Sequence, residues 1–152
     1  MIPTPTSPAG DHEPASLPRR LGAVFYDTLL LLALLMLGSF LYVPVAGNAL
    51  PAPLGRALYQ VFLLAISFFY FTGFWVRGGQ TLGLRTWKLR LVTRDGGSVT
   101  WPQATQRFAL ALVSWLCLGL GFLWVLVDRE KLAWHDRFSG TRLVRLPNAP
   151  HK

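Results

Sequence analysis

The sequence predicts an all-α membrane protein with two transmembrane helices, a third apolar segment and a small cytoplasmic β-sheet. Hydrophobic residues make up 52% of the 152 residues and charged residues only 14%, against roughly 25% charged in soluble globular proteins. The apolar residues lie in three almost uncharged stretches, residues 21–43, 57–76 and 108–127. Each has about the ~20 residues that a membrane-crossing helix needs. Helices of a soluble core are instead apolar on one face only.

The two ends of the chain differ in composition from this middle part. Residues 1–18 hold five of the eleven prolines, and such a segment buries too little apolar area to offset its ordering entropy. We therefore expect a disordered tail over residues 1–18, a membrane domain over residues 19–146 and a short C-terminal tail over residues 147–152. A cleaved secretory signal is the alternative, but the first apolar run is too long and contains Asp27.

The first predicted span follows Arg19 and Arg20 and ends at Pro44, because a proline ring interrupts a continuing helix. The second predicted span covers residues 57–76 and carries Trp75 near its end. Tryptophan side chains are enriched at the level of the lipid headgroups.

Between residues 80 and 101 the apolar blocks give way to alternation, which indicates a β-strand with Trp87, Leu89 and Leu91 on one face. The Asp-Gly-Gly run at residues 95–97 is typical of a tight reversal, so residues 98–100 are expected to return as the partner strand. Residues 141–145 alternate as well and would supply a third strand.

The third apolar segment is ambiguous, and the distribution of Lys and Arg favours one of two interpretations. The positive-inside rule places the N-terminus and residues 77–107 in the cytoplasm, and the loop with Arg56 outside. A third full crossing would leave eight cations inside and seven outside. A re-entrant helical hairpin that turns at residues 119–121 would leave fourteen inside and one outside. Such a turn must be covered by protein rather than lipid.

The net charge of +8 raises the question of an anionic partner. The opposite face of the predicted sheet carries Lys88, Arg90 and Arg94, joined by Arg142 and Arg145 if the third strand forms. At the inner leaflet each such cation attracts anionic lipid by about 1 kcal/mol. We therefore expect anionic lipids, and not nucleic acid, as the partner of this basic surface.

The order of several short motifs resembles that of the RDD family of bacterial membrane proteins, named for one arginine and two aspartates. The resemblance covers residues 18–146 and rests on Arg20 to Asp27, the Gly-Gln-Thr-Leu-Gly run at residues 79–83, residues 89–92, residues 95–97 and residues 135–141. It implies that the family's arginine is Arg20 and that its aspartates are Asp27 and Asp136. It also implies an integral protein of the bacterial cytoplasmic membrane, suspected of transport, with cation/proton antiport proposed for some members. Leu84 departs from the pattern, since relatives commonly carry Lys or Arg there.

Asp27 is the sharpest candidate for chemistry, because a charge within a membrane span costs on the order of 3 kcal/mol. Arg20 lies on the same helix face, about 10 Å away along the axis, and Arg107 is an equally good partner from another segment. One hypothesis makes Asp27 a proton- or cation-binding carboxylate. The alternative is a buried Asp-Arg pair that orients the first helix and never titrates.

A second candidate lies after the last apolar segment, where His135 precedes Asp136. The pair could respond to pH near neutrality, or Asp136 could pin the turn into the final strand. The spacing of the histidines and the single Cys117 indicate no metal site and no cofactor. The sequence also contains no nucleophile and base at a readable spacing, so we do not expect an enzyme.

These observations favour an inner-membrane protein with several spans and a cytoplasmic N-terminus that moves a small ligand or cation, with or without coupling to protons. About 150 residues leave little room to enclose a route, so a homo-oligomer is expected. The alternative is a scaffold or accessory subunit that does not transport and docks a cytoplasmic partner.

Overall fold

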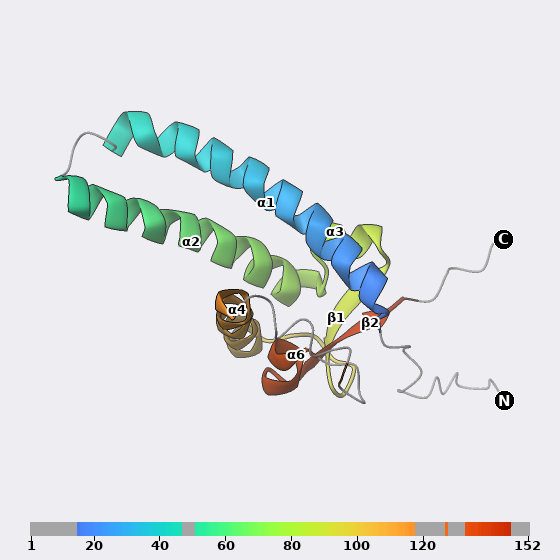
Figure 1. The fold of residues 1–152 in the computed structure, drawn as a ribbon. Helices are drawn as coiled ribbons and strands as arrows, with labels where there is room; N and C mark the ends of the chain where they lie inside the picture. The colour runs from blue at the N-terminus through green and yellow to red at the C-terminus, as the bar shows by residue number, and fades with distance from the viewer. Residues whose placement is uncertain (1–14, 47–50, 118–126, 128–132, 147–152) are drawn as a thin grey trace, which may run out of the picture.

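The computed structural model describes residues 15–46, 51–117, 127 and 133–146. Two long helices, a short helix, a strand, a third long helix, a short helix and a second strand follow one another along these residues (Figure 1). They are α1 (Leu17–Ala46), α2 (Ala52–Gly78), α3 (Leu82–Thr86), β1 (Leu89–Thr93), α4 (Trp101–Leu116), α6 (Trp134–Phe138) and β2 (Thr141–Arg145).

Helices α1 and α2 form an antiparallel hairpin, and within the described residues they are the two helices long and apolar enough to cross a membrane (Figure 1). In the most apolar window of α1 no residue is buried, and in that of α2 only 6% are. The helices approach closely at Gly38, where an added Cβ would lie 2.7 Å from Ile66 Cδ1. Apolar faces left outside the hairpin are typical of helices surrounded by lipid, because in a soluble core they would be covered.

Both ends of α1 lie beyond the predicted bounds. At its start, Ala15 is buried and its amide donates to the carbonyl of Leu143 at 3.2 Å, so ordered structure begins before the predicted tail boundary at residue 18. At the other end the helix continues past Pro44 to Ala46. The prediction of an end at Pro44 is wrong by two residues, because a proline this close to a helix end removes little more than its own amide bond.

A short connection after α2 packs against α1. Gly79 ends α2 in the left-handed conformation (φ 69°), and its amide donates to the carbonyl of Trp75. Thr81 then caps α3 by accepting from the Leu84 amide. Gly83 lies so close to α1 that an added Cβ would overlap the carbonyl oxygen of Ala23. The run at residues 79–83 is therefore a docking element for α1.

The sheet has two antiparallel strands, β1 and β2, with Leu91 opposite Leu143. The prediction that residues 98–100 form the partner strand is wrong, since the structure assigns no strand there. The turn closes on Thr93, whose amide donates to the carbonyl of Gly97 at 3.0 Å, and Thr100 becomes the N-cap of α4. The segment at residues 141–145, predicted as a third strand, is the partner of β1.

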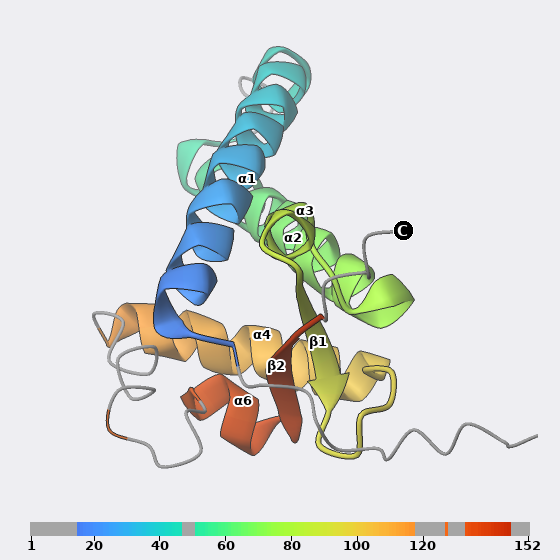
Figure 2. The same cartoon turned by 90° about the vertical axis from the view of Figure 1, so that its right-hand side faces the viewer.

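Helix α4 runs across the hairpin at the end where α1 begins and α2 ends, which we call its inner end, rather than alongside the two helices (Figures 1 and 2). It has 16 residues and is not among the candidate spans of the described chain. A third crossing is therefore not confirmed. The proposed re-entrant turn at residues 119–121 lies outside the described residues.

The core forms where the sheet, α3 and α4 meet the inner ends of α1 and α2. Leu89 and Leu91 of β1 are fully buried there against Ala104 and Phe108 of α4. Trp75 of α2 is also buried in this core. The fold thus joins a membrane-type hairpin to a small sheet with its own core.

The close approach of Gly83 to α1 gives a prediction about stability. In Gly83→Ala the new Cβ would overlap backbone of α1 and lie 2.7 Å from Asp27 Cγ, so we expect a loss of about 1–3 kcal/mol, as for an overpacked core. Thermal unfolding of the purified protein in detergent measures it. Gly73→Ala is the matched control, because a Cβ there meets nothing within 4 Å and should stabilise α2 by about 0.5–1 kcal/mol. Equal melting temperatures for the two variants would contradict the packing of α3 on α1.

Candidate functional site

A single buried carboxylate, Asp136, binds two arginines that are distant in the sequence. Arg20 Nη1 of α1 lies 2.8 Å from Asp136 Oδ2, and Arg107 Nη1 of α4 contacts Asp136 Oδ1. The amide of Ala133, the N-cap residue of α6, also donates to Oδ2 at 3.1 Å. All three charged residues are at most 7% exposed. We call Arg20, Arg107 and Asp136 the Asp136 cluster, and it ties together α1, α4 and α6.

Arg107 makes further contacts that fix its guanidinium. Its Nη1 donates to Thr141 Oγ1 of β2 at 2.9 Å, and its Cζ lies 5.2 Å from the ring centroid of Trp75, which is within cation–π range. Its Nε is buried and has no hydrogen-bond partner among the described residues. One donor of this side chain is therefore unused.

The cluster shifts the pKa values of its acid and of the neighbouring histidine. Burial alone would raise the pKa of Asp136, but the Arg107 guanidinium, with help from His135 and Arg20, holds it well below its usual range. Burial, together with the Arg107 charge, lowers the pKa of His135 to about 3. His135 is therefore neutral at physiological pH, and its surroundings do not favour the hypothesis of a switch near neutrality.

Asp27 lies apart from these cations and is bound by neutral donors. Its Oδ1 accepts from Tyr70 Oη at 3.0 Å and from the Gly83 amide at 2.9 Å, and its Oδ2 accepts from Thr81 Oγ1. We call Asp27, Tyr70, Thr81 and Gly83 the Asp27 cluster. The predicted pairing of Asp27 with Arg20 or Arg107 is wrong, because both arginines reach Asp136 instead. Asp27 joins α1 to α2 and α3.

The predicted basic surface of the sheet is divided by the strand register. Arg90 lies opposite Val144, whereas Arg145 lies opposite Leu89, on the other face. Arg142 and Arg145 are three residues apart, and side chains in a strand alternate with a period of two, so they cannot share a face. Lys88 precedes β1 with φ 54°, and Arg94 Nη2 donates to the carbonyl of Arg137. The five cations do not form one face.

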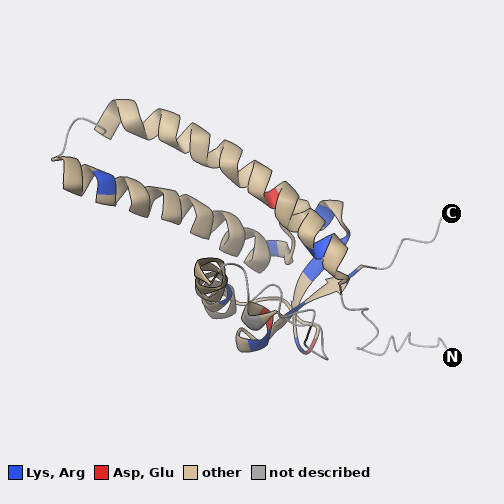
Figure 3. Ribbon diagram, in the orientation of Figure 1, with Lys and Arg blue, Asp and Glu red and all other residues tan. Residues whose placement is uncertain are grey.

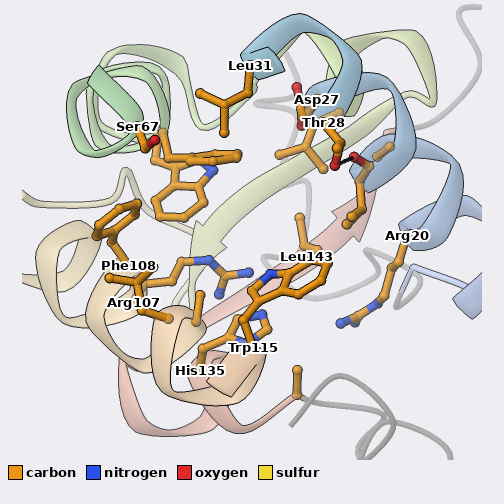
Figure 4. Close-up of a pocket in the computed structure, with 18 of the residues that line it drawn as sticks. Arg20, Asp27, Thr28, Leu31, Ser67, Arg107, Phe108, Trp115, His135 and Leu143 are labelled. Atoms are coloured by element: carbon orange, nitrogen blue, oxygen red, sulfur yellow. Dashed lines mark hydrogen bonds between the residues drawn. The ribbon is translucent and has the colours of Figure 1, made fainter. Parts of the chain in front are cut away.

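A partly open cavity of about 340 Å³ lies between α1, α2 and α4, beside both clusters. Most of its wall is apolar, and its polar lining residues are Arg20, Asp27, Thr28, Ser67, Arg107 and His135. Figure 4 shows Asp27 and Thr28 toward one end and the Arg107 guanidinium reaching from α4 toward Leu143. Leu84 also lines the wall. Among the described residues no group of His, Cys, Asp and Glu could hold a metal ion.

Sequence reasoning missed the neutral donors of the site. Tyr70 is one of several aromatic residues of the second span, and Thr81 and Gly83 stand out in the sequence only as part of the Gly-Gln-Thr-Leu-Gly run at residues 79–83. An acidic side chain within an apolar span needs hydrogen-bond donors. This requirement is the feature of the sequence that could have pointed to Tyr70, Thr81 and Gly83. Thr141, which contacts Arg107, gave no signal beyond its place at the start of a strand.

Removing the charge of Asp136 should destabilise the fold strongly. In Asp136→Asn the guanidinium groups of Arg20 and Arg107 stay buried without a counter-charge, which typically costs about 3–5 kcal/mol. Asp95→Asn is the control, because Asp95 is exposed in the turn after β1 and its change should fall within about 0.5 kcal/mol. Membrane abundance and thermal unfolding in detergent report both. A variant as stable as the control would show that the ion pairs do not support the fold.

Stability should fall as the pH is lowered through the range in which His135 titrates. The unfolded chain binds a proton near pH 6.5, but folded His135 binds one only near pH 3. The stabilisation is thus fully present above pH 6.5 and is lost below it by up to about 1.4 kcal/mol per pH unit. Thermal unfolding between pH 8 and pH 4 measures the slope. His135→Gln should flatten it, and an unchanged slope would assign it to other groups.

The comparisons with known proteins identify the family. The RDD family model matches residues 14–140, which include α1 to α6 and both clusters. No curated protein and no solved structure matched the chain. The matched range covers most of the 152 residues, and the two candidate spans agree with the membrane location of the family. The chain therefore belongs to the RDD family of membrane proteins.

Proposed function

We propose that the protein binds a small ligand in the cavity between α1, α2 and α4 and moves it across the membrane. The observation that carries this proposal is the position of the cavity. It lies against two candidate spans and holds polar groups among apolar walls. Ligand sites typically combine a mostly apolar lining with a few oriented polar groups. A purely structural hairpin would have no need of such a space.

The chemistry of the two clusters bears on what could be moved. Three donors point at Asp27, and Thr81 Oγ1 also accepts from the Leu84 amide, so its proton is free for Asp27. Both oxygens of Asp27 are thus occupied by α2 and by the connection that contains α3, which supports a structural role for Asp27 in joining these elements to α1. The proposal assigns Asp27 no part in the movement of the ligand.

We also propose that the protein lies in the bacterial inner membrane with α3, α4 and the sheet on the cytoplasmic side. Cations gather at that end of the hairpin, whereas Arg56 is in the first turns of α2 at the other end (Figure 3). The positive-inside rule assigns the cation-rich end to the cytoplasm, where exposed cations such as Arg77 and Arg90 would contact anionic lipids. A homo-oligomer remains part of this proposal.

Filling the cavity should stop transport. Ala111 lines the cavity on α4, so Ala111→Trp should block it. Ala109, exposed on the same helix, supplies the control Ala109→Trp. Purified proteins are reconstituted in liposomes, and the efflux of rubidium, octanesulfonate and octyltrimethylammonium is followed with and without a pH gradient. We expect at least one probe to leave at least tenfold faster with the wild type and the control than with Ala111→Trp.

Two results would count against a transporter. Efflux that is equal in all three proteins would remove the cavity from the route. Absence of efflux for every probe, together with a stoichiometric partner recovered from detergent extract, would favour the scaffold function instead. The efflux of the two Trp variants can be compared only if their melting temperatures match, which would show that they are equally stable. Both changes add the same side chain to α4.

A further inference from the structure

We infer that the cavity takes a single-chain amphiphile with an anionic head group, whose head binds Arg107 and whose chain lies between the spans. The inference rests on the proposed function, because it names the class of ligand for the same cavity. Neither the family nor the proposed transport specifies this class.

The head-group site is the unused donor of Arg107. Arg107 is 3% exposed and lines the cavity, and its Nη1 is occupied by Asp136 and Thr141. Its Nε is covered and has no partner among the described residues. A buried donor that lacks an acceptor is unfavourable, and an anionic oxygen that displaces the side chains covering Nε would complete it with a charge-assisted bond. The stacking of the guanidinium on Trp75 holds this donor in place.

Asp27, which lines the cavity, and Asp136, which binds two of its lining arginines, favour an anion over a cation for a different reason. Both oxygens of Asp27 already accept hydrogen bonds from neutral donors. Both oxygens of Asp136 contact arginines. A cationic head would therefore have to displace an existing partner, whereas an anionic head would not.

The chain site is the apolar wall. Leu31 of α1, Leu64 and Phe71 of α2, and Leu112 of α4 line the space. The volume of about 340 Å³ is at the lower end of the roughly 300–1,000 Å³ of small-molecule sites. This size suits one short chain rather than a lipid with two. Because the cavity is partly open between helices with exposed apolar faces, the chain could enter from the surrounding lipid.

The test uses the full protein in nanodiscs of zwitterionic lipid, with tryptophan fluorescence as the readout. Trp75 is 8% exposed and lines the cavity, so a bromo-octanesulfonate bound at Arg107 should quench it in a saturable way. The matched bromo-octyltrimethylammonium should give only the linear quenching of lipid partitioning. Because Trp115 also lines the cavity, Trp75→Phe should reduce the saturable part, and Trp75→Phe combined with Trp115→Phe should remove it. Arg107→Lys keeps a cation for Asp136 but lacks Nε, and should weaken binding at least tenfold.

Several outcomes would overturn the inference. Two of them are equal quenching by both probes and an unchanged affinity for bromo-octanesulfonate in Arg107→Lys. A third is complete loss of the saturable quenching when inorganic sulfate alone is added. A fourth is complete loss of the saturable quenching when the nanodisc contains phosphatidylglycerol. The last result would identify a bilayer lipid as the occupant. If Arg107→Lys does not fold, the comparison of the two probes on the wild type decides. Rubidium efflux that Ala111→Trp blocks, without sulfonate binding, would reject the ligand class and leave transport intact.

Discussion

One buried carboxylate, Asp136, determines how the parts of this molecule meet. It binds Arg20 at the start of α1 and Arg107 in α4, and it caps α6 through the Ala133 amide. A buried ion pair adds little net stability over apolar packing, because the desolvation of both charges offsets their attraction. Its effect lies in specificity. Any arrangement that separates these segments leaves a buried charge without a partner, so the alternatives are unfavourable.

Asp27 performs the equivalent task for the membrane hairpin with neutral groups. Tyr70 of α2 and the Thr81–Gly83 connection all donate to it, so α1, α2 and α3 have one relative position. Hydrogen-bond donors can hold a buried carboxyl group as well as cations can. The predicted guanidinium partner of Asp27 is therefore wrong, because neutral groups donate to both of its oxygens.

The sequence was informative where a pattern is local and weak where partners are distant. The apolar lengths indicated α1 and α2, and alternation indicated β1 and β2, because these patterns depend on neighbours in the chain. The pairing of β1 with β2 joins residues about fifty positions apart, and a nearby Asp-Gly-Gly turn suggested a closer partner. The assignment of Arg20 to Asp136 spans 116 positions. Periodicity cannot decide which of the two candidate arginines pairs with which of the two candidate aspartates, Asp27 and Asp136, since each pairing satisfies the same local pattern.

The two clusters also restrict how the cavity between them could change shape. Separating Arg107 from Asp136 would expose uncompensated buried charge, at a cost of about 3–5 kcal/mol. The wall above them is instead formed by apolar side chains such as Leu31 and Leu64, whose contacts are individually weak and have no fixed direction. Toward the loop that joins them, α1 and α2 also meet through apolar packing at Gly38 and through the ring pairs of Tyr42 with Tyr59 and Phe62, beside one hydroxyl contact between Ser39 and Tyr59. A ligand that passes this cavity would therefore displace the apolar parts of α1 and α2 from α4, while the Asp136 cluster keeps its geometry.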